Sequence, residues 1–479
     1  MSDWHVDGWH VWSTAFLVAE WVIRLVMLAY VPYRRSPNAA RAWLLLIFLE
    51  PVVGVVLYAI FGRAYLPKWR IERQRRSSAY LRARRDAAPP GLLAAGPTLE
   101  PRFQQAVQLA EKLADFPMVP GNALELIDDY QGAIDRLVAD IDGASLHVHL
   151  LYYIFEPDRT GRQVADAVIR AARRGVRCRV MMDASGSKPG LRVLAPGMRA
   201  QGVEVLAALP RRRGARFDLR NHRKIAVVDG RMAYIGSQNV VDAYGYKGRK
   251  ITYEELVVRA SGPVVRQLQA VFLLDRYLET GEELAEEGLF PQPVAAGAAA
   301  AQSLPSGPTY PVENGQRLMV ALVHAARERV VLTTPYFVPD EPFQQAVQSA
   351  ALRGVEVHLV VPRAVDQPLV RLAQEAHYEP LLESGVRIHR YRTRFLHAKH
   401  LSFDGAAAII GSSNIDIRSF ALNEEISLLV YDPEVVARLR VVQERYLAES
   451  DPLTLEEWRR RPLVRKLAES LALMVDALF

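Results

Sequence analysis

The sequence contains one structural unit twice, and this duplication limits what the chain can fold into. Residues 171–183 (AARRGVRCRVMMD) and 350–362 (AALRGVEVHLVVP) share a pattern: a helical segment, a glycine that ends it, and an apolar run typical of a buried strand. Strands that alternate with helices favour an α/β fold with a parallel or mixed sheet. We therefore expect two duplicated α/β/α halves, which can share one site at the axis that relates them.

The distribution of apolar, basic and loop-forming residues divides the chain into six parts. Two hydrophobic segments come first, basic residues follow, and a stretch rich in Pro, Ala, Gly and Ser separates the two halves. We expect N-terminal membrane segments over 1–66, a basic linker over 67–99, a first half over 100–290, a joining loop over 291–315, a second half over 316–450 and a C-terminal amphipathic helix over 451–479.

The two N-terminal hydrophobic segments predict a helical hairpin, with helices near 11–33 and 42–62. Each is long enough to cross about 30 Å of hydrocarbon as a helix. In the first, Glu20 and Arg24 have the spacing to pair along one helix face, although a soluble amphipathic helix can show the same pattern. In the second, Pro51 favours a kink or a turn back, so one crossing, two crossings and a re-entrant hairpin all stay open.

Basic residues flank these segments, and their distribution favours one orientation. More Arg and Lys follow the second segment than lie in the short loop between the two. Because positively charged flanks favour the cytoplasmic side, we expect the larger part of the chain to lie in the cytoplasm.

The pattern HxKxxxxD occurs twice, once in each half, and in both copies GSxN begins fourteen residues after the histidine. A shared pattern of this length is far more specific than an isolated short motif. The first copy provides His222, Lys224, Asp229, Ser237 and Asn239, and the second provides His397, Lys399, Asp404, Ser412 and Asn414.

The spacing within each motif has structural meaning. Residues two apart on a strand point to the same side, so each histidine and its lysine are expected side by side. Each motif aspartate precedes a glycine between two apolar runs, which predicts a hairpin turn. Although they complete the catalytic motif, Asp229 and Asp404 are therefore interpreted as turn and framework residues. The returning strands are expected to bring the serines and asparagines beside the histidines.

Two histidines, two lysines, two serines and two asparagines that converge would form an anion site without a metal ion. The lysines would stabilise charge on a phosphoryl oxygen, one imidazole can attack phosphorus, and the other can move protons. Carboxylates would tune the two rings, and candidates follow each motif as Glu254/Glu255 and Glu424/Glu425. Because Cys178 is the only cysteine, an internal disulfide and a cysteine-based metal centre are excluded, and we expect no metal and no cofactor.

The paired motifs are similar to those of the phospholipase D superfamily, and the whole chain resembles bacterial membrane-anchored cardiolipin synthases. Residues 36–63 resemble the membrane region of that family, and NHRKIAVVDG, GSQN, FLHAKHLSFDG and GSSNIDIRSFALNEE resemble its catalytic blocks. The resemblance implies two phospholipase D-like halves that form one active site, and a place in the bacterial inner (plasma) membrane.

The resemblance also implies residue roles. His222 would be the nucleophile that forms a phosphatidyl-histidine, and His397 would be the general acid and then the general base. The phosphate would be held by Lys224, Lys399, Asn239 and Asn414, with help from Ser237 and Ser412, and the imidazoles would be oriented by Glu255 and Glu425. The implied reaction transfers a phosphatidyl group between two phosphatidylglycerol molecules and gives cardiolipin and glycerol.

Other functions stay open as alternatives. A related phosphatidyltransferase or a phospholipase D-type hydrolase would use another donor lipid or water, and a phosphodiesterase or nuclease would use the same motifs. The formal net charge of +7 is modest for 479 residues and no aromatic stacking platform is evident, so nucleic acid is not an expected partner. Two intact motifs disfavour a non-catalytic scaffold. We expect phospholipids and the membrane as partners, and a homo-oligomer is left open.

Near the C-terminus, Leu463, Leu467 and Leu471 have the spacing of one helix face and follow Trp458 and a cluster of arginines. A helix of this kind can dock its apolar side on the protein core or lie in a membrane interface. The sequence leaves both alternatives open.

Overall fold

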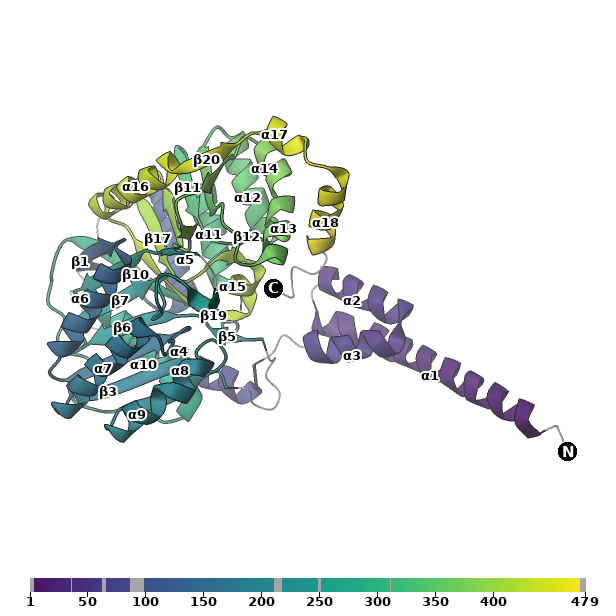
Figure 1. Cartoon of the computed structure of the whole chain (residues 1–479), viewed down its shortest axis with the longest axis horizontal. Helices are drawn as coiled ribbons and strands as arrows, with labels where there is room; N and C mark the ends of the chain where they lie inside the picture. The colour runs from purple at the N-terminus through teal and green to yellow at the C-terminus, as the bar shows by residue number, and fades with distance from the viewer. Residues whose placement is uncertain are drawn as a thin grey trace. The chain divides into compact units, whose positions relative to one another are not determined.

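The computed structural model describes residues 4–35, 37–62, 66–86, 99–210, 218–248, 251–310 and 312–473. These residues belong to two compact units, which divide between Leu66 and Pro67. The N-terminal unit contains α1 (Trp4–Arg34), α2 (Pro37–Leu49) and α3 (Pro51–Phe61), and the second unit contains the described strands and the other helices (Figure 1).

Helix α1 contains the stretch that is long and apolar enough to cross a membrane, Trp12–Arg34. Large apolar side chains along it are exposed, among them Trp12 at 79%. Glu20 and Arg24 form the ion pair that their spacing predicts, with 3.1 Å between Oε2 and Nη1. An exposed apolar helix whose two charges neutralise each other suits a lipid environment.

The second hydrophobic segment is broken at Pro51 into α2 and α3, where a single helix near 42–62 is one of the expectations from the sequence. A Cβ atom on Gly54 would lie 2.7 Å from the Cα atom of Ile47, so α3 folds back against α2. At about 1.5 Å per residue each of these helices is shorter than the roughly 30 Å of a bilayer core. The geometry is that of a short helical hairpin, one of the arrangements that the proline leaves open.

The strands and helices of the first half are listed here in chain order. They are α4 (Lys68–Asp86), α5 (Pro101–Ala114), β1 (Val119–Ile127), α6 (Tyr130–Asp142), β2 (His147–Tyr152), α7 (Arg159–Arg173), β3 (Arg177–Asp183), α8 (Lys188–Val193), α9 (Ala195–Ala200), β4 (Glu204–Ala208), β5 (Arg220–Asn221), β6 (Lys224–Val228), β7 (Met232–Gly236), β8 (Tyr253–Glu254), β9 (Val257–Ser261) and α10 (Val265–Thr280).

The strands and helices of the second half follow, also in chain order. They are β10 (Ala299–Ser306), α11 (Asn314–Ala325), β11 (Arg329–Thr333), β12 (Phe337–Val338), α12 (Glu341–Leu352), β13 (Glu356–Pro362), α13 (Pro368–Ala376), α14 (Tyr378–Glu383), β14 (Arg387–Tyr391), β15 (Phe395–Leu396), β16 (His400–Phe403), β17 (Ala407–Gly411), β18 (Ile415–Asp416), α15 (Ile417–Ala421), β19 (Asn423–Val430), α16 (Pro433–Ala448), β20 (Ser450–Leu453), α17 (Leu455–Arg459) and α18 (Leu463–Leu473).

One continuous sheet joins the two halves. Its strand order is β20-β14-β13-β11-β16-β17-β19-β10-β1-β9-β7-β6-β2-β3-β4. In the first half β2, β3 and β4 are parallel and β6 and β7 return antiparallel, and in the second half β11, β13 and β14 are parallel and β16 and β17 return antiparallel. The antiparallel pair of β1 and β10 connects them. The expected duplication of an α/β unit is confirmed.

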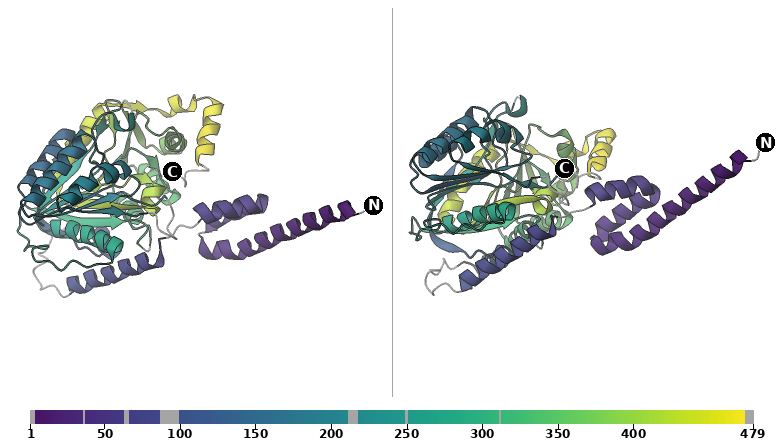
Figure 2. Two further views of the ribbon diagram at one scale, coloured as in Figure 1. Left: turned by 60° about the horizontal axis from the view of Figure 1, so that its bottom comes forward. Right: turned by 90° about the horizontal axis from the view of Figure 1, so that it is seen from below.

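Helices cover both faces of this sheet (Figure 2). One outer hydrophobic core lies under α6, α7 and α9 of the first half. Another lies under α11 and α12 of the second half, and α5 of the first half also packs into it. A central core contains residues of α10 and α16 together with strand residues from both halves. This shared core fixes the halves against each other, so a site between them can be rigid.

Two sequence signals recur at matching places in the halves. Gly175 and Gly354 follow α7 and α12 with φ of +90° and +89°, the left-handed conformation that ends a helix. Asp229–Gly230 connects β6 to β7 with φ of +53° and +61°, and the equivalent turn connects β16 to β17. Positive φ at both central residues defines the tight hairpin turn that Asp-Gly favours, so the predicted hairpins are confirmed.

Three segments are more ordered than their expected roles imply. Residues 68–86 of the expected basic linker form α4, whose Arg70 makes a buried ion pair with Glu279 at 2.6 Å. The expected joining loop contributes β10, because its alanine-rich end pairs with β1 and β19. The expected C-terminal helix begins with β20 and α17, and Leu463–Leu473 forms the amphipathic helix α18; residues 474–479 lie outside the described residues.

Candidate active site

The two motif histidines lie where short parallel strand pairs join the halves. His222 follows β5, which pairs with β19 of the second half, and its N–H donates to the carbonyl of Glu424 at 2.8 Å. His397 follows β15, which pairs with β8 of the first half, and its N–H donates to the carbonyl of Glu254, also at 2.8 Å. The backbone of each histidine is therefore fixed by the opposite half.

The imidazoles are also held by the opposite half. Nδ1 of His222 lies 3.0 Å from Oε2 of Glu425, and Nδ1 of His397 lies 2.7 Å from Oε1 of Glu255. Both glutamates are buried. With Nδ1 bonded to a carboxylate, the Nε2 atom of each ring is the one left for substrate.

The neighbouring glutamates have a different role. Glu254 forms ion pairs with Arg394 at 3.1 Å and Arg445 at 2.9 Å, and Glu424 pairs with Arg223 at 3.1 Å. The sequence leaves two candidates after each motif, and the structure places the second of each pair beside a histidine ring.

Each motif lysine lies against the backbone of its own histidine. Lys224 Nζ donates to the carbonyl of His222 and Lys399 Nζ donates to the carbonyl of His397, both at 2.6 Å. Both ammonium groups are almost fully buried. They therefore supply positive charge beside the backbone of the two histidines, in a place where water screens it weakly.

The serines of the two GSxN motifs are buried and bond the backbone next to the site. Ser237 Oγ accepts the N–H of Leu256 and Ser412 Oγ accepts the N–H of Ile426, both at 3.0 Å. Ser412 Oγ also donates to Oε2 of Glu425 at 2.5 Å. Their hydroxyls fix the strands and carboxylates that hold the histidines, and the expectation that these serines help to hold the phosphate stays a prediction.

One cavity of about 590 Å³ contains the functional ends of both motifs. Its lining includes His222, His397, Asn239 and Asn414. Asn239 Oδ1 accepts the N–H of Ile154 at 3.1 Å, which leaves its NH2 group as a donor. Both histidine rings therefore line one common pocket, as a site shared by the two halves requires.

Aromatic and charged side chains line the cavity around the two histidines. Tyr153 lies beside His222 with 4.6 Å between ring centroids, and Arg220 and Arg418 also line the cavity. Beside His397 the lining is aromatic, with Tyr253 at 5.5 Å between centroids. Each histidine therefore has a tyrosine beside it in the cavity wall, and the lining also contains both arginines and acidic residues.

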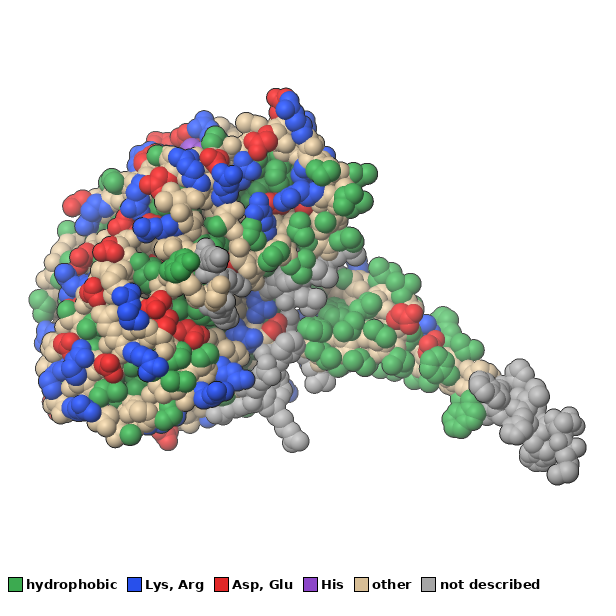
Figure 3. Space-filling model, viewed as in Figure 1, with side chains coloured by type: hydrophobic (Ala, Val, Ile, Leu, Met, Phe, Trp, Pro, Cys, Tyr) green, Lys and Arg blue, Asp and Glu red, His purple; other side chains and the backbone are tan. Residues whose placement is uncertain are grey.

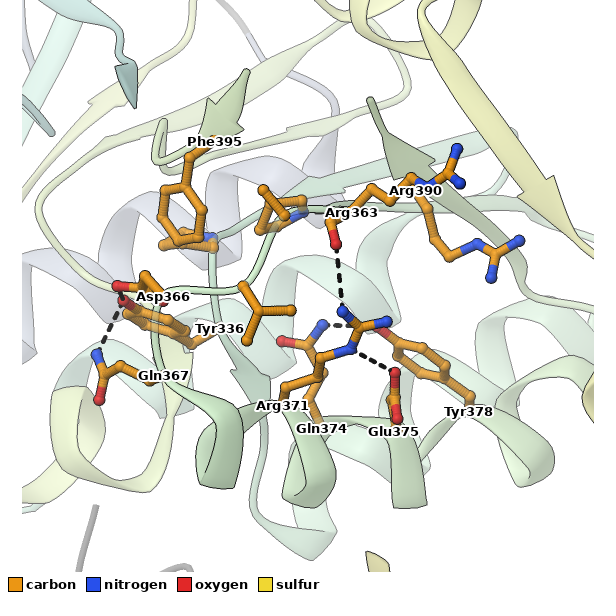
Figure 4. Close-up of a pocket in the computed structure, with 14 residues that line it drawn as sticks. Tyr336, Arg363, Asp366, Gln367, Arg371, Gln374, Glu375, Tyr378, Arg390 and Phe395 are labelled. Atoms are coloured by element: carbon orange, nitrogen blue, oxygen red, sulfur yellow. Dashed lines mark hydrogen bonds and ion pairs between the residues drawn. The ribbon is translucent and has the colours of Figure 1, made fainter. Parts of the chain in front are cut away.

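A smaller cavity of about 20 Å³ adjoins the first and shares Tyr336, Asp366 and Gln367 with it (Figure 4). The hydroxyl of Tyr336 donates to Asp366 at 2.5 Å and accepts from Gln367 Nε2 at 2.9 Å. On α13, Arg371 Nε pairs with Glu375 at 2.7 Å. These contacts fix the start of α13, which forms one wall of the large cavity.

Burial and neighbouring charges shift the pKa values of the ionisable groups in the site. Burial lowers the pKa of His222 to about 4, and it lowers the pKa of Lys224 to about 7 and of Lys399 to about 8. Burial alone would raise the pKa of Glu425, but His222 and Lys224 lower it overall. The pair is thus a neutral imidazole that donates to an ionised carboxylate.

The motif aspartates are placed away from this chemistry. Asp229 accepts the backbone N–H groups of 145–147 at 2.7–2.9 Å. Asp404 accepts those of 327–329 at 2.8–2.9 Å and pairs with Arg102 at 2.5 Å. Each carboxylate ties the hairpin turn to the start of the neighbouring strand, as their interpretation as framework residues predicts.

One buried network was not predicted. Arg223 is fully buried, pairs with Asp275 of α10, and donates from Nε to the carbonyl of Glu425 at 2.9 Å. Asn221 also donates to Asp275, at 3.0 Å. The signal that could have indicated it is Asp275 itself, a lone acid in the apolar run VFLLDRYL. The second motif has Ala398 where the first has Arg223, so this support is specific to His222.

Comparisons with known proteins agree with this geometry. A family model described as "Cardiolipin synthase, PLD-like domain" matches residues 137–276 and 319–447, and one described as "Phospholipase_D-nuclease N-terminal" matches residues 21–63. The phosphatidylserine synthase of Haemophilus influenzae Rd KW20 superposes with a TM-score of 0.62 at 14% identity, over 78% of this chain and 100% of that chain, which shows a shared fold. The fold and site are those of the phospholipase D superfamily.

Relatives of nearly the same length show to which family within this superfamily the chain is similar. It is 34% identical to cardiolipin synthase A of Proteus mirabilis (strain HI4320), over 96% of both chains. It is 35% identical to cardiolipin synthase A of Serratia proteamaculans (strain 568), over 95% of both chains. The chain belongs to the cardiolipin synthase family, and it is a phosphatidyltransferase of the phospholipase D superfamily.

Proposed function

We propose that this protein makes cardiolipin by transferring the phosphatidyl group of one phosphatidylglycerol molecule to a second one, with release of glycerol. The observation that carries the proposal is the pair of crossed His–Glu contacts, His222–Glu425 and His397–Glu255, whose rings line one cavity. The names of the full-length relatives support the choice of cardiolipin as the product.

The first step is proposed to be attack by Nε2 of His222 on phosphorus of the donor lipid. The P–O bond to the headgroup glycerol breaks, and the leaving oxygen takes a proton from Nε2 of His397. His222 suits the nucleophile because its pKa of about 4 keeps the ring neutral, and Glu425 holds its Nδ1–H. The product of this step is a phosphatidyl-histidine and free glycerol.

The second step reverses the proton movement. A hydroxyl group of the second phosphatidylglycerol gives its proton to His397 and attacks phosphorus, and the P–N bond to His222 breaks. Glu255 stabilises the positive charge that His397 carries before it donates its proton in the first step and regains in the second. The bound anionic phosphodiester favours that charge as well.

The lysines and asparagines would stabilise the phosphoryl oxygens through both steps. Lys224 and Lys399 are buried against the backbone carbonyls of the two histidines, so their charges act across a medium of low polarity. Asn239 and Asn414 face the cavity and can donate to the same oxygens. This arrangement performs with fixed side chains what a metal ion does in other phosphoryl-transfer sites.

The direct test uses the full-length protein in phosphatidylglycerol vesicles that carry separate labels in the acyl chains and the headgroup glycerol. We expect one glycerol released for each cardiolipin formed. Phosphatidic acid instead of cardiolipin would identify a hydrolase and overturn the proposal. His222→Ala should abolish turnover, and His324→Ala, at an exposed position, is the matched control.

We further propose that α1 holds the protein in the inner membrane of a bacterial cell, with the catalytic unit in the cytoplasm. The apolar stretch Trp12–Arg34 and the basic residues that follow the second hydrophobic segment support this orientation. A Val441→Cys variant tests it, because Val441 is 72% exposed on α16 and Cys178 is buried. A membrane-impermeant maleimide should label this cysteine only after the cells are opened, and labelling in intact spheroplasts would contradict the orientation.

A further inference from the structure

Helix α18 is amphipathic, and its polar side faces the protein. Glu469 is 1% exposed and Ala472 is 2% exposed, so these two residues mark the buried side. Arg461 pairs with Glu379 of α14 at 2.8 Å, and Arg465 pairs with Glu375 of α13. In a water-soluble protein a helix of this type places its apolar side against the core, so this orientation is reversed.

The outer side of α18 is apolar. Leu463, Val464, Leu467 and Leu471 are 70%, 78%, 56% and 64% exposed. Their spacing puts them on one stripe of the helix, and Figure 3 shows hydrophobic side chains gathered along α18. Large aliphatic residues rarely line up in this way on a free surface, which points to a partner that covers them.

The ion pairs prevent the helix from turning this stripe inward. Glu375 is buried and pairs with Arg371 of α13 (Figure 4) and with Arg465 of α18. Glu469 is shared by Arg461 at 2.9 Å and Arg465 at 3.5 Å. A rotation of α18 that buried its leucines would leave these buried carboxylates without partners, at a large energetic cost. The exposure of the stripe is therefore built into the fold.

The protein-facing side of α18, opposite the stripe, packs against residues of the active-site cavity. Ala472 of α18 packs in one small apolar cluster with Val338, Val370 and Ala373. Val338 and Val370 are themselves part of the cavity lining. Helix α18 is therefore packed on the wall of the pocket that holds the two histidines.

We infer that α18 docks on the surface of a lipid bilayer and places the cavity mouth against the leaflet that contains the substrates. The inference rests on the proposed function, because a diacyl lipid must present its headgroup to the cavity while its chains stay in the leaflet. Just before α18, Arg459 and Arg460 are 53% and 75% exposed and pair with Glu383 and Glu456, so the apolar stripe is bordered by surface ion pairs at the level expected for a membrane interface.

The test uses a fluorescent label on α18 in the full-length protein. Leu467→Cys introduces an exposed cysteine, while Cys178 is 3% exposed and burial raises the pKa of its thiol to about 12, so it does not compete for the label. The protein is labelled with an environment-sensitive dye and placed in phosphatidylglycerol vesicles whose acyl chains carry a spin-label quencher. Val441→Cys on α16, 72% exposed and also aliphatic, is the matched control.

We expect the acyl-chain quencher to reduce the signal from position 467 at least threefold more than the signal from position 441. Equal, weak quenching at both positions would overturn the inference. Energy transfer between labels on position 467 of two chains, without quenching by lipid, would show that a second copy covers the stripe and would also overturn it.

An activity measurement separates this inference from the proposed function. Leu467→Glu should lower cardiolipin formation from long-chain phosphatidylglycerol in vesicles about tenfold, and it should leave turnover of monomeric short-chain phosphatidylglycerol unchanged. Val441→Glu should change neither. Equal losses on both substrates would overturn the docking role. If the unmodified protein forms no cardiolipin from either substrate, the proposed function fails, and the quenching measurement still decides whether α18 meets lipid.

Discussion

Glu425 of the second half accepts a hydrogen bond from His222 of the first half, with 3.0 Å between Oε2 and Nδ1. The reciprocal contact joins His397 to Glu255 at 2.7 Å. Because each ring is held by a carboxylate of the opposite half, neither half contains a complete histidine–carboxylate pair. The duplicated unit can work only with both copies in place.

Glu425→Gln should reduce kcat for cardiolipin formation about 100-fold, which is within the range for loss of general acid–base support. The glutamine amide has nearly the same size, but its NH2 group can donate to Nδ1 of His222 and favour the tautomer with a proton on Nε2. The measurement is kcat in phosphatidylglycerol vesicles, together with a thermal melt to show that the fold is kept. Loss of less than threefold in kcat would show that the crossed contact does not support the chemistry.

His397→Ala should leave formation of the covalent intermediate intact when the donor lipid carries a nitrophenyl headgroup, because nitrophenolate leaves without a proton. We expect a burst of about one nitrophenol per protein, followed by slow turnover because no base activates the acceptor. His222→Ala should give no burst with the same donor. A burst in His222→Ala that is missing in His397→Ala would mean that the two histidines have the opposite roles.

The local parts of the fold follow from the sequence. The turn at Asp229–Gly230 and the helix end at Gly175 depend only on residues close together in the chain, and both are found where the pattern predicts them. The break of the second hydrophobic segment at Pro51 has a local cause as well, and only the direction in which α3 folds back needs the contact between Gly54 and Ile47.

The crossed contacts at the site could not be predicted in the same way. The motif spacing indicates which residues meet but not which half supplies the carboxylate to each ring, because that depends on β5 pairing with β19 and β8 pairing with β15. These are two-residue pairings between segments far apart in the chain. The role of Arg223 is hidden for a related reason, since its partner Asp275 comes from α10 and the two meet only in the folded protein.

The pH dependence should report the buried lysines. Because the pKa of Lys224 is lowered to about 7 and that of Lys399 to about 8, their positive charge is lost as the pH rises through this range. We expect kcat/KM to fall on the alkaline side with an apparent pKa between about 7 and 8. On the acid side His222, with a pKa of about 4, should stay neutral and active down to about pH 5.

Lys224→Arg tests the origin of the alkaline limb, because a guanidinium keeps its charge at these pH values. Activity will be lower, since arginine does not fit the space of Lys224, but the limb should move to higher pH as Lys399 becomes the first of the two sites to lose charge. If the pH at which kcat/KM falls is the same in Lys224→Arg as in the unmodified protein, a group other than Lys224 causes the fall. The measurement is the pH profile of kcat/KM for both proteins in vesicles of constant composition.

Asp229→Asn should affect stability far more than chemistry. Asn tolerates the positive φ of this turn, so the variant removes only the charge that accepts the N–H groups of 145–147. Although burial alone would raise the pKa of Asp229, these hydrogen bonds lower it overall, so its contribution to stability is present above the unfolded pKa of about 3.9 and is lost as the pH falls through the folded pKa. We expect the free energy of unfolding at pH 7 to fall by about 1–3 kcal/mol.

Thermal and urea unfolding at pH 7 check this expectation for Asp229→Asn, with Asp166→Asn at an exposed position as the control that should change nothing. Well below the unfolding temperature, kcat of Asp229→Asn should stay within about threefold of the unmodified protein, because the carboxylate lies at the hairpin turn and not in the cavity. Asp404→Asn should behave in the same way, since its carboxylate makes the equivalent contacts with 327–329. A variant with unchanged stability and a 100-fold lower kcat would instead make the motif aspartate part of the chemistry, and the framework role argued from its hydrogen bonds would be wrong.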